Sequence, residues 1–183
     1  IILNFWSELG LLGLFAFGWI LFVFFKNAIR NYSLLVTRYS LLLIGPPGHG
    51  YEEIKKEIRA SQYKDSIRET GYLDRETADE YLANAALFAF PSLYEGFGLP
   101  MLEAFAAGTP ALCSDIPALK EVGGDAAVYC NPRNPKDIAE KMRLMLKDTA
   151  LRNRAIQQGR ARAREYSWEK SAEKTFAIIT EGV

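Results

Sequence analysis

Two glutamates bracket the part of the sequence whose residue types are best suited to binding a ligand. The stretch reads EGFGLPMLE, and it begins at Glu95 and ends at Glu103. Gly96 and Gly98 within it allow the backbone to approach a ligand closely and to adopt positive φ where a turn requires it. The pattern therefore predicts a close-approach loop with a carboxylate on either side of it.

A helix is predicted to begin directly after this loop, at Leu99 and Pro100, because proline fits the first turn of a helix. The unpaired N–H groups of that turn favour a phosphate or another electron-rich oxygen. Glu103, one turn into the helix, could accept hydrogen bonds from two adjacent hydroxyls such as a ribose diol, and Glu95 could accept from sugar hydroxyls. A plain turn followed by an exposed helical glutamate fits the same spacing, so the spacing leaves both interpretations open.

The elements that must position this stretch alternate between strands and helices from residue 39 onwards. Short apolar runs predict strands and amphipathic stretches predict helices. This alternation predicts an α/β fold with a parallel sheet and helices on both faces. Ligands of such sheets bind beyond the carboxyl ends of the strands, which is where the 91–99 loop falls. The predicted strands are 39–44, 66–72, 87–90, 111–114 and 126–130. The predicted helices are 51–60, 75–86, 100–107, 135–147, 151–165 and 168–179. Asp74 is predicted to be the N-cap of the helix that runs to residue 86, and a turn is predicted at 117–120.

The charge balance of the chain hides two unlike parts. The 183 residues carry 22 basic and 22 acidic side chains, with a pI near 6.8. This balance argues against nucleic-acid binding, which usually requires a basic excess. Almost all of these charges lie after residue 40, and those before it are Glu8, Lys26, Arg30 and Arg38.

Residues 1–30 are predicted to form one hydrophobic, transmembrane helix. Leu9–Phe25 carries no charge, and as a helix it spans about 25 Å of the roughly 30 Å hydrocarbon core. Lys26 and Arg30 follow directly, which favours a cytoplasmic location for what comes next. We therefore expect contact with the membrane through residues 1–25, at the cytoplasmic face of the bacterial inner membrane. A buried helix of a soluble protein is the alternative, and the segment also resembles a late transmembrane helix of O-antigen ligase and polymerase proteins.

The chain from Leu41 to about Ile179 resembles the C-terminal half of a GT-B glycosyltransferase of the retaining family 4, also called group 1. The resemblance is carried by FPSLYEGFGLPMLEAFAAGTPALCSDIPALKEVGGDAAVYCNPRNP at residues 90–135. IGPPGHGYEE at 44–53, GYL at 71–73 and YSWEKSAEKTF at 166–176 support it. The resemblance implies a Rossmann-like, three-layer parallel sheet, with a donor-binding domain at 40–183 and a junction at 31–39.

The resemblance also implies roles for the residues that match the family's motif. Glu95 would be the catalytic candidate, in contact with hydroxyls of the transferred sugar, and Glu103 would hold the ribose of the nucleotide. Tyr72, within 71–73, would line the base pocket. No metal or other cofactor is expected beyond the nucleoside diphosphate sugar. The backbone facing the sugar and diphosphate would be that of Gly96, Phe97, Gly98 and Leu99.

The sequence departs from the family's pattern in its first part. The family's C-terminal half normally begins with a strand and a helix that carry an Arg and a Lys for the donor diphosphate, and we expect that unit to be absent, with Arg38 at the end of the lost helix. Each lost charge-assisted hydrogen bond would cost about 1.5–3 kcal/mol. The acceptor-binding half, which usually brings a catalytic histidine, is also expected to be missing. His49 lies in a GPPGHG turn and is not expected to replace that histidine.

These observations favour the donor-binding part of a retaining glycosyltransferase, inactive alone. The reaction would transfer a sugar from a nucleoside diphosphate sugar to a glycan or lipid-linked acceptor in surface polysaccharide synthesis, with a complementary N-terminal half-domain as a candidate partner. Two alternatives stay open: a non-catalytic, membrane-tethered nucleotide-sugar-binding module, and a chimeric gene fragment without independent function. Whether the chain is an enzyme in its own right is left undecided by the sequence.

Two features near the C-terminus favour packing and solvation over ligand binding. The arginines of GRARARE alternate along a predicted helix, so they spread over different faces and predict a solvated helix rather than a phosphate or lipid site. Trp168 in YSWEK is predicted to be a packing anchor. The three arginines are Arg160, Arg162 and Arg164.

Overall fold

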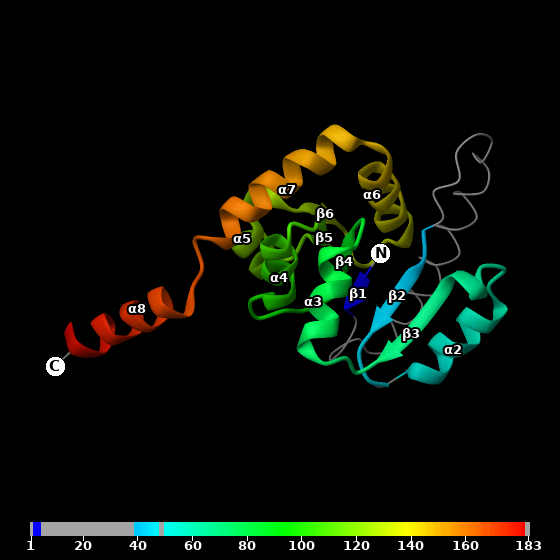
Figure 1. Ribbon diagram of the computed structural model, residues 1–183, viewed down its shortest axis with the longest axis horizontal. Coiled ribbons are helices and arrows are strands. Elements are labelled where there is room, and N and C mark those ends of the chain that lie inside the picture. The colour runs from blue at the N-terminus through cyan, green and yellow to red at the C-terminus, as the bar shows by residue number, and fades with distance from the viewer. Residues whose placement is uncertain (1, 5–38, 48–49, 182–183) are drawn as a thin grey trace.

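The computed structural model describes residues 2–4, 39–47 and 50–181 (Figure 1). Its strands are β1 (Ile2–Asn4), β2 (Leu41–Ile44), β3 (Ile67–Gly71), β4 (Phe88–Phe90), β5 (Ala111–Ser114) and β6 (Val128–Cys130). Its α-helices are α2 (Tyr51–Ala60), α3 (Arg75–Ala83), α4 (Leu99–Ala107), α5 (Pro117–Gly123), α6 (Pro135–Lys147), α7 (Thr149–Ala163) and α8 (Trp168–Glu181).

The strands form one parallel sheet in the order β3-β2-β1-β4-β5-β6. Chain order runs outward in one direction from β1 to β3 and in the other direction from β4 to β6. The strand order therefore reverses between β1 and β4, which is where doubly wound sheets bind ligands. This confirms the predicted α/β, Rossmann-like parallel sheet.

Strand β1 corrects two predictions about the start of the chain. Leu3 lies opposite Leu43 of β2 and Ala89 of β4, so Ile2–Asn4 is a central strand and not part of a helix. The prediction that the sheet lacks its first strand is therefore wrong. The physical reason is that a short apolar run, which parallel pairing on both sides permits, has no periodicity to distinguish a strand from a helix.

The other predictions for residues 5–38, and the prediction for His49, concern positions outside the described residues. Within the described ranges, no helix combines the length and the apolar character needed to cross a membrane.

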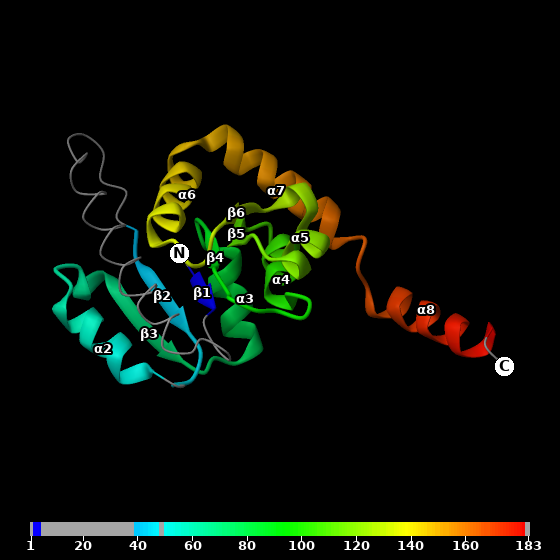
Figure 2. The same cartoon turned by 180° about the vertical axis from the view of Figure 1, so that it is seen from behind.

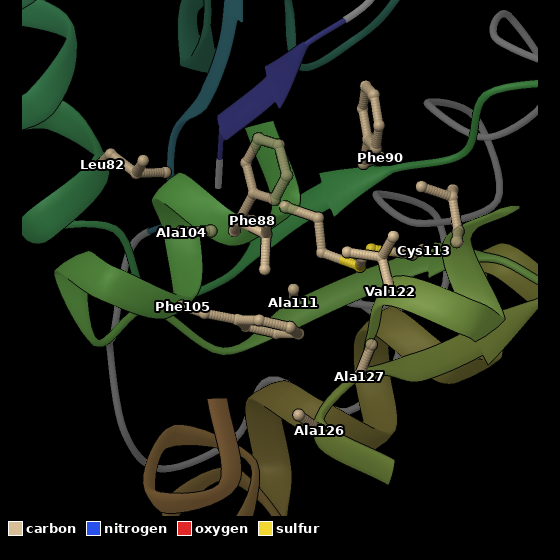
Figure 3. Close-up of a cluster of buried hydrophobic side chains, with 13 residues drawn as sticks. Leu82, Phe88, Phe90, Ala104, Phe105, Ala111, Cys113, Val122, Ala126 and Ala127 are labelled. Carbon is tan, nitrogen blue, oxygen red and sulfur yellow. The ribbon is translucent and has the colours of Figure 1, made fainter. Parts of the chain in front are cut away.

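Successive side chains along each strand point to opposite faces of the sheet, and each face packs into its own hydrophobic core. Leu87 and Ala89 face a core shared with α2 and α6, whereas Phe88 and Phe90 face a core shared with α3, α4 and α5. Figure 3 shows the second core, in which Phe105 of α4 lies near Ala111 of β5. This alternation makes the three layers and fixes α4, the helix that follows the EGFG loop, against the sheet.

The last two helices differ in how they contact the body of the protein. Helix α7 packs on α4 so closely that a Cβ at Gly159 would lie 2.8 Å from Cδ1 of Phe105. Helix α8 projects away from the body in both views (Figures 1 and 2). Trp168 at its start is 78% exposed, so the prediction that this ring anchors packing is wrong.

Candidate functional site

The loop Pro91–Gly98 lies at the carboxyl end of β4, beside the point where the strand order reverses. Gly98 ends it with φ of +91° and precedes the first residue of α4. A Cβ at this position would lie 2.3 Å from Cδ2 of Leu119 in α5. Both the left-handed conformation and the close approach require glycine here.

Glu95 is held by hydrogen bonds that connect the loop to a neighbouring strand. The Ser92 hydroxyl donates to Oε1 of Glu95 at 2.9 Å, and the Ser114 hydroxyl donates to the carbonyl oxygen of Ser92 at 2.5 Å. Ser114 is the last residue of β5 and is fully buried. Glu95 is therefore placed at the carboxyl edge of the sheet by the core beneath it.

Glu103 lies in the second turn of α4 and faces the start of α3. Its Oε1 is 3.8 Å from Nη2 of Arg75, and its side chain is 45% exposed. Partial burial raises the pKa of the Glu103 carboxyl, the Arg75 guanidinium lowers it and Asp79 raises it. Because the net shift is upward, the protein environment does not fully compensate the carboxylate charge. The carboxylate thus keeps capacity to accept further hydrogen bonds.

The upward shift in the Glu103 pKa predicts a pH-dependent cost to stability. The folded state holds the proton more tightly than the unfolded state, whose pKa is near the ordinary value of 4.5. As the pH rises through the interval between these two values, the free energy of unfolding therefore falls. We expect Glu103→Gln to become more stable relative to the parent chain over this interval, as measured by urea unfolding at a series of pH values. A relative stability that declines with rising pH would contradict the assignment.

Tyr72 lies on the same edge of the sheet as the loop Pro91–Gly98, but three strands away. It follows β3, it is 81% exposed, and the N–H of Gly45 after β2 donates to the carbonyl oxygen of Gly71 at 2.9 Å. With strands about 4.8 Å apart, β3 and β4 are separated by about 14 Å. A ligand that contacts both Tyr72 and Glu95 must therefore be extended along this edge.

The predicted site residues thus share one edge of the sheet. Glu95, Gly96, Phe97 and Gly98 form the loop, and Leu99 and Glu103 lie on the helix that it begins. The backbone N–H of Leu99 has no acceptor within the helix, since it precedes the first helical hydrogen bond. Gly96, Phe97 and Leu99 are exposed.

Three contacts at this site involve residues that the sequence interpretation did not select. Ser92 binds Glu95, Arg75 faces Glu103, and the ring of Tyr166 packs on Phe97. The three-residue spacing of Ser92 and Glu95 is a local signal for such a bond. The other two pairs are far apart in the sequence and offered no local signal. Within the described ranges, no group of three or more His, Cys, Asp or Glu side chains is placed to hold a metal ion.

Comparison with known proteins identifies the family. The family model described as "Glycosyl transferases group 1" matches residues 25–162. This chain belongs to the group 1 glycosyltransferases. The matched range includes the loop Pro91–Gly98 and both glutamates of the site.

Similar proteins agree with this family assignment. The O-antigen chain mannosyltransferase B of Escherichia coli is 36% identical to this glycosyltransferase chain over 155 residues, covering 82% of the chain and 41% of the relative. Sucrose-phosphate synthase from Thermosynechococcus elongatus aligns with a TM-score of 0.76 at 22% identity, over 98% of this chain and 45% of that protein. Anabaena Alr3699/HepE in complex with UDP aligns with a TM-score of 0.74 at 16% identity. That alignment covers 100% of this chain and 49% of the Anabaena protein. These structures share the fold, and the chain spans less than half the length of each of the three proteins.

Proposed function

We propose that this chain binds the nucleoside diphosphate part of a sugar donor along the carboxyl edge of its sheet, as part of a mannosyltransferase. The observation that carries the proposal is the pair of carboxylates on either side of Gly98, at the reversal of strand order between β1 and β4. Family membership and the similarity to a mannosyltransferase support it.

The proposed roles follow the order of the residues along the edge. Tyr72 contacts the base, and Glu103 accepts hydrogen bonds from the two ribose hydroxyls. The backbone of Gly96–Leu99 faces the diphosphate and the sugar, where free N–H groups at a helix start stabilise negative charge. Glu95 accepts from hydroxyls of the transferred sugar.

The proposed transfer retains the configuration of the anomeric carbon, and its acceptor is a glycan or a lipid-linked glycan of a surface polysaccharide. In the transition state, negative charge grows on the leaving diphosphate while positive charge grows on the anomeric carbon. Backbone amides that are already oriented toward the diphosphate would stabilise the first charge without reorganisation. The Glu95 carboxylate would hold the sugar in place and stabilise the positive charge on the anomeric carbon.

We further propose that the chain is inactive alone and requires a complementary half-domain for the acceptor. Helix α8 supports this, because Trp168, Phe176, Ile178 and Ile179 on it are 63–78% exposed. Large exposed apolar side chains on one element are typical of surfaces that another protein segment covers. A location at the cytoplasmic face of the inner membrane remains part of the proposal, and the uncharged, apolar composition of Leu9–Phe25 supports it.

A non-catalytic nucleotide-sugar-binding module is the second candidate function. The described donor-binding groups along the sheet edge would serve such a module equally well. It predicts the same nucleotide binding, so binding alone does not separate the two candidates.

Calorimetry with UDP, GDP and ADP tests the proposed binding function. We expect at least one of them to bind the chain with a dissociation constant of about 1 mM or lower, equivalent to about −4 kcal/mol. Failure of all three to bind would overturn the proposal. Sugar transfer from GDP-mannose to a mannose disaccharide, assayed with and without a separately produced acceptor-binding half of a related enzyme, then separates enzyme from binding module. Transfer by the chain alone would overturn the proposed inactivity.

A further inference from the structure

We infer that Tyr166 is a positioning residue that fixes the loop Pro91–Gly98 for the donor through the ring of Phe97. The inference rests on the proposed function, since it concerns the same binding edge. It adds a residue from the segment between α7 and α8, far from the loop in sequence.

The loop needs such a restraint because its backbone is intrinsically free. Phe97 stands between Gly96 and Gly98, and glycine restricts φ and ψ less than any other residue. The space where a Cβ of Gly96 would lie has no heavy atom within 4 Å, so packing does not confine that residue. The hydrogen bond from Ser92 to Glu95 restrains the first half of the loop. The conformation of the second half depends on Gly98 and on what the Phe97 side chain contacts.

The ring of Phe97 contacts Tyr166. The two ring centroids are 5.7 Å apart and the planes are inclined by 81°, an edge-to-face arrangement. Such pairs have a preferred geometry because the electron-poor edge of one ring faces the electron-rich face of the other. Phe97 is still 42% exposed, so Tyr166 supports the ring on one side without burying it in the core.

Tyr166 is itself held in place by Arg162. An Nη2–H of Arg162 donates to the Tyr166 hydroxyl at 2.9 Å, and the guanidinium carbon lies 5.2 Å from the centroid of the same ring. Arg162 also forms an ion pair with Glu165. A side chain held through both its ring and its hydroxyl has little rotational freedom, and it can therefore serve as a fixed support.

Arg162, which holds Tyr166, is itself bound to helix α5. Arg162 donates from Nε to the carbonyl oxygen of Val122 at 2.8 Å and from Nη2 to that of Glu121 at 2.7 Å. These carbonyls belong to the last turn of α5, where a cation is favoured. The same helix carries Leu119, against which Gly98 is packed. Helix α5 thus positions the second half of the loop at two points. It contacts Gly98 directly, and it supports Phe97 through Arg162 and Tyr166.

Amide hydrogen exchange of the full chain, without ligand, tests whether Tyr166 restrains the loop. We expect Tyr166→Leu to raise exchange in residues 92–99 by about three- to tenfold, which corresponds to the usual strength of an aromatic pair. Tyr166→Phe keeps the ring and should raise it by less than about twofold. Trp168→Leu removes an exposed ring two residues further along and is the matched control. Equal exchange in the parent and Tyr166→Leu would overturn the inference.

A double-mutant cycle tests whether the effect reaches the donor through Phe97. Using the diphosphate that the parent binds, we expect Tyr166→Leu to raise the dissociation constant by about three- to tenfold. In a Phe97→Leu background the same change should have an effect of less than about twofold, because the contact is already lost. Equal effects in both backgrounds would indicate a general structural role and overturn the inference.

The results of these two tests distinguish a failure of this inference from a failure of the proposed function. If the parent binds none of the diphosphates, the proposed function and the donor part of this inference are overturned, whereas the exchange result still decides whether Tyr166 restrains the loop. If exchange rises in Tyr166→Leu but the dissociation constant does not, the donor role of Tyr166 is overturned while the proposed function stands.

Discussion

Replacing Glu103 by alanine is expected to weaken nucleoside diphosphate binding by about ten- to hundredfold. A hydrogen bond to a charged group contributes about 1.5–3 kcal/mol, and each 1.4 kcal/mol corresponds to a factor of ten in the dissociation constant. Glu103 is half-exposed and its partner Arg75 is 3.8 Å away. We therefore count the free energy of one hydrogen bond to the carboxylate, although the ribose offers two hydroxyls. Calorimetric titration of parent and variant measures the change.

The matched control for this substitution is Glu140→Ala, which removes an exposed glutamate from α6, on the other face of the sheet. It should bind as the parent does. Glu103→Ala itself should remain folded, because the carboxylate charge is partly desolvated and its pKa is raised. Unchanged binding by a folded Glu103→Ala chain would contradict the assignment of the ribose site.

Replacing Gly98 by alanine is expected to lower the free energy of unfolding by about 2–4 kcal/mol and to abolish measurable nucleotide binding. The left-handed backbone costs an alanine about 1 kcal/mol or more, and overpacking costs about 1–3 kcal/mol. The overpacking arises because the new Cβ would meet Cδ2 of Leu119 at 2.3 Å. For a chain of this size the melting temperature should fall by about 5–15 °C, as measured by circular dichroism.

The neighbouring Gly96 provides the matched control. Alanine at Gly96 would meet no heavy atom within 4 Å, so its effect on the melting temperature should be small. The double variant Gly98→Ala, Leu119→Ala should relieve the clash but keep the backbone strain, and its loss should be smaller than the sum of the two single losses. Equal melting temperatures for Gly98→Ala and Gly96→Ala would show that this turn does not require glycine.

Much of the fold could be predicted because its signals are local. The helix at 51–60 and the helix at 135–147 lie at the predicted bounds, since amphipathic spacing is a property of neighbouring residues. Asp74 accepts a hydrogen bond from the Thr77 N–H as a helix cap, which its position before a polar helix predicts. The boundary between the loop Pro91–Gly98 and helix α4 is also a local signal, because glycines and a proline determine where a loop ends and a helix begins.

Residues 117–120 show where local signals are insufficient. A turn is predicted there, whereas the structure contains helix α5, whose buried residues Leu119 and Val122 pack into the core against β4 and β5. A helix this short is unstable alone and forms because tertiary packing compensates for its cost. Strand β1 is a similar case, since Ile2, Leu3 and Asn4 become a strand through pairing with the strands on either side of them.

The sequence alone determined the alternation of strands and helices, the loop at the end of β4 and the two carboxylates beside it. These are encoded by residues within a few positions of one another. The tertiary structure decided which distant residues support that loop. Tyr166 meets Phe97 because α7, which precedes Tyr166, packs on α4, and Arg75 faces Glu103 because α3 lies beside α4. Such contacts depend on the packing of whole elements, whose relative positions no local pattern specifies.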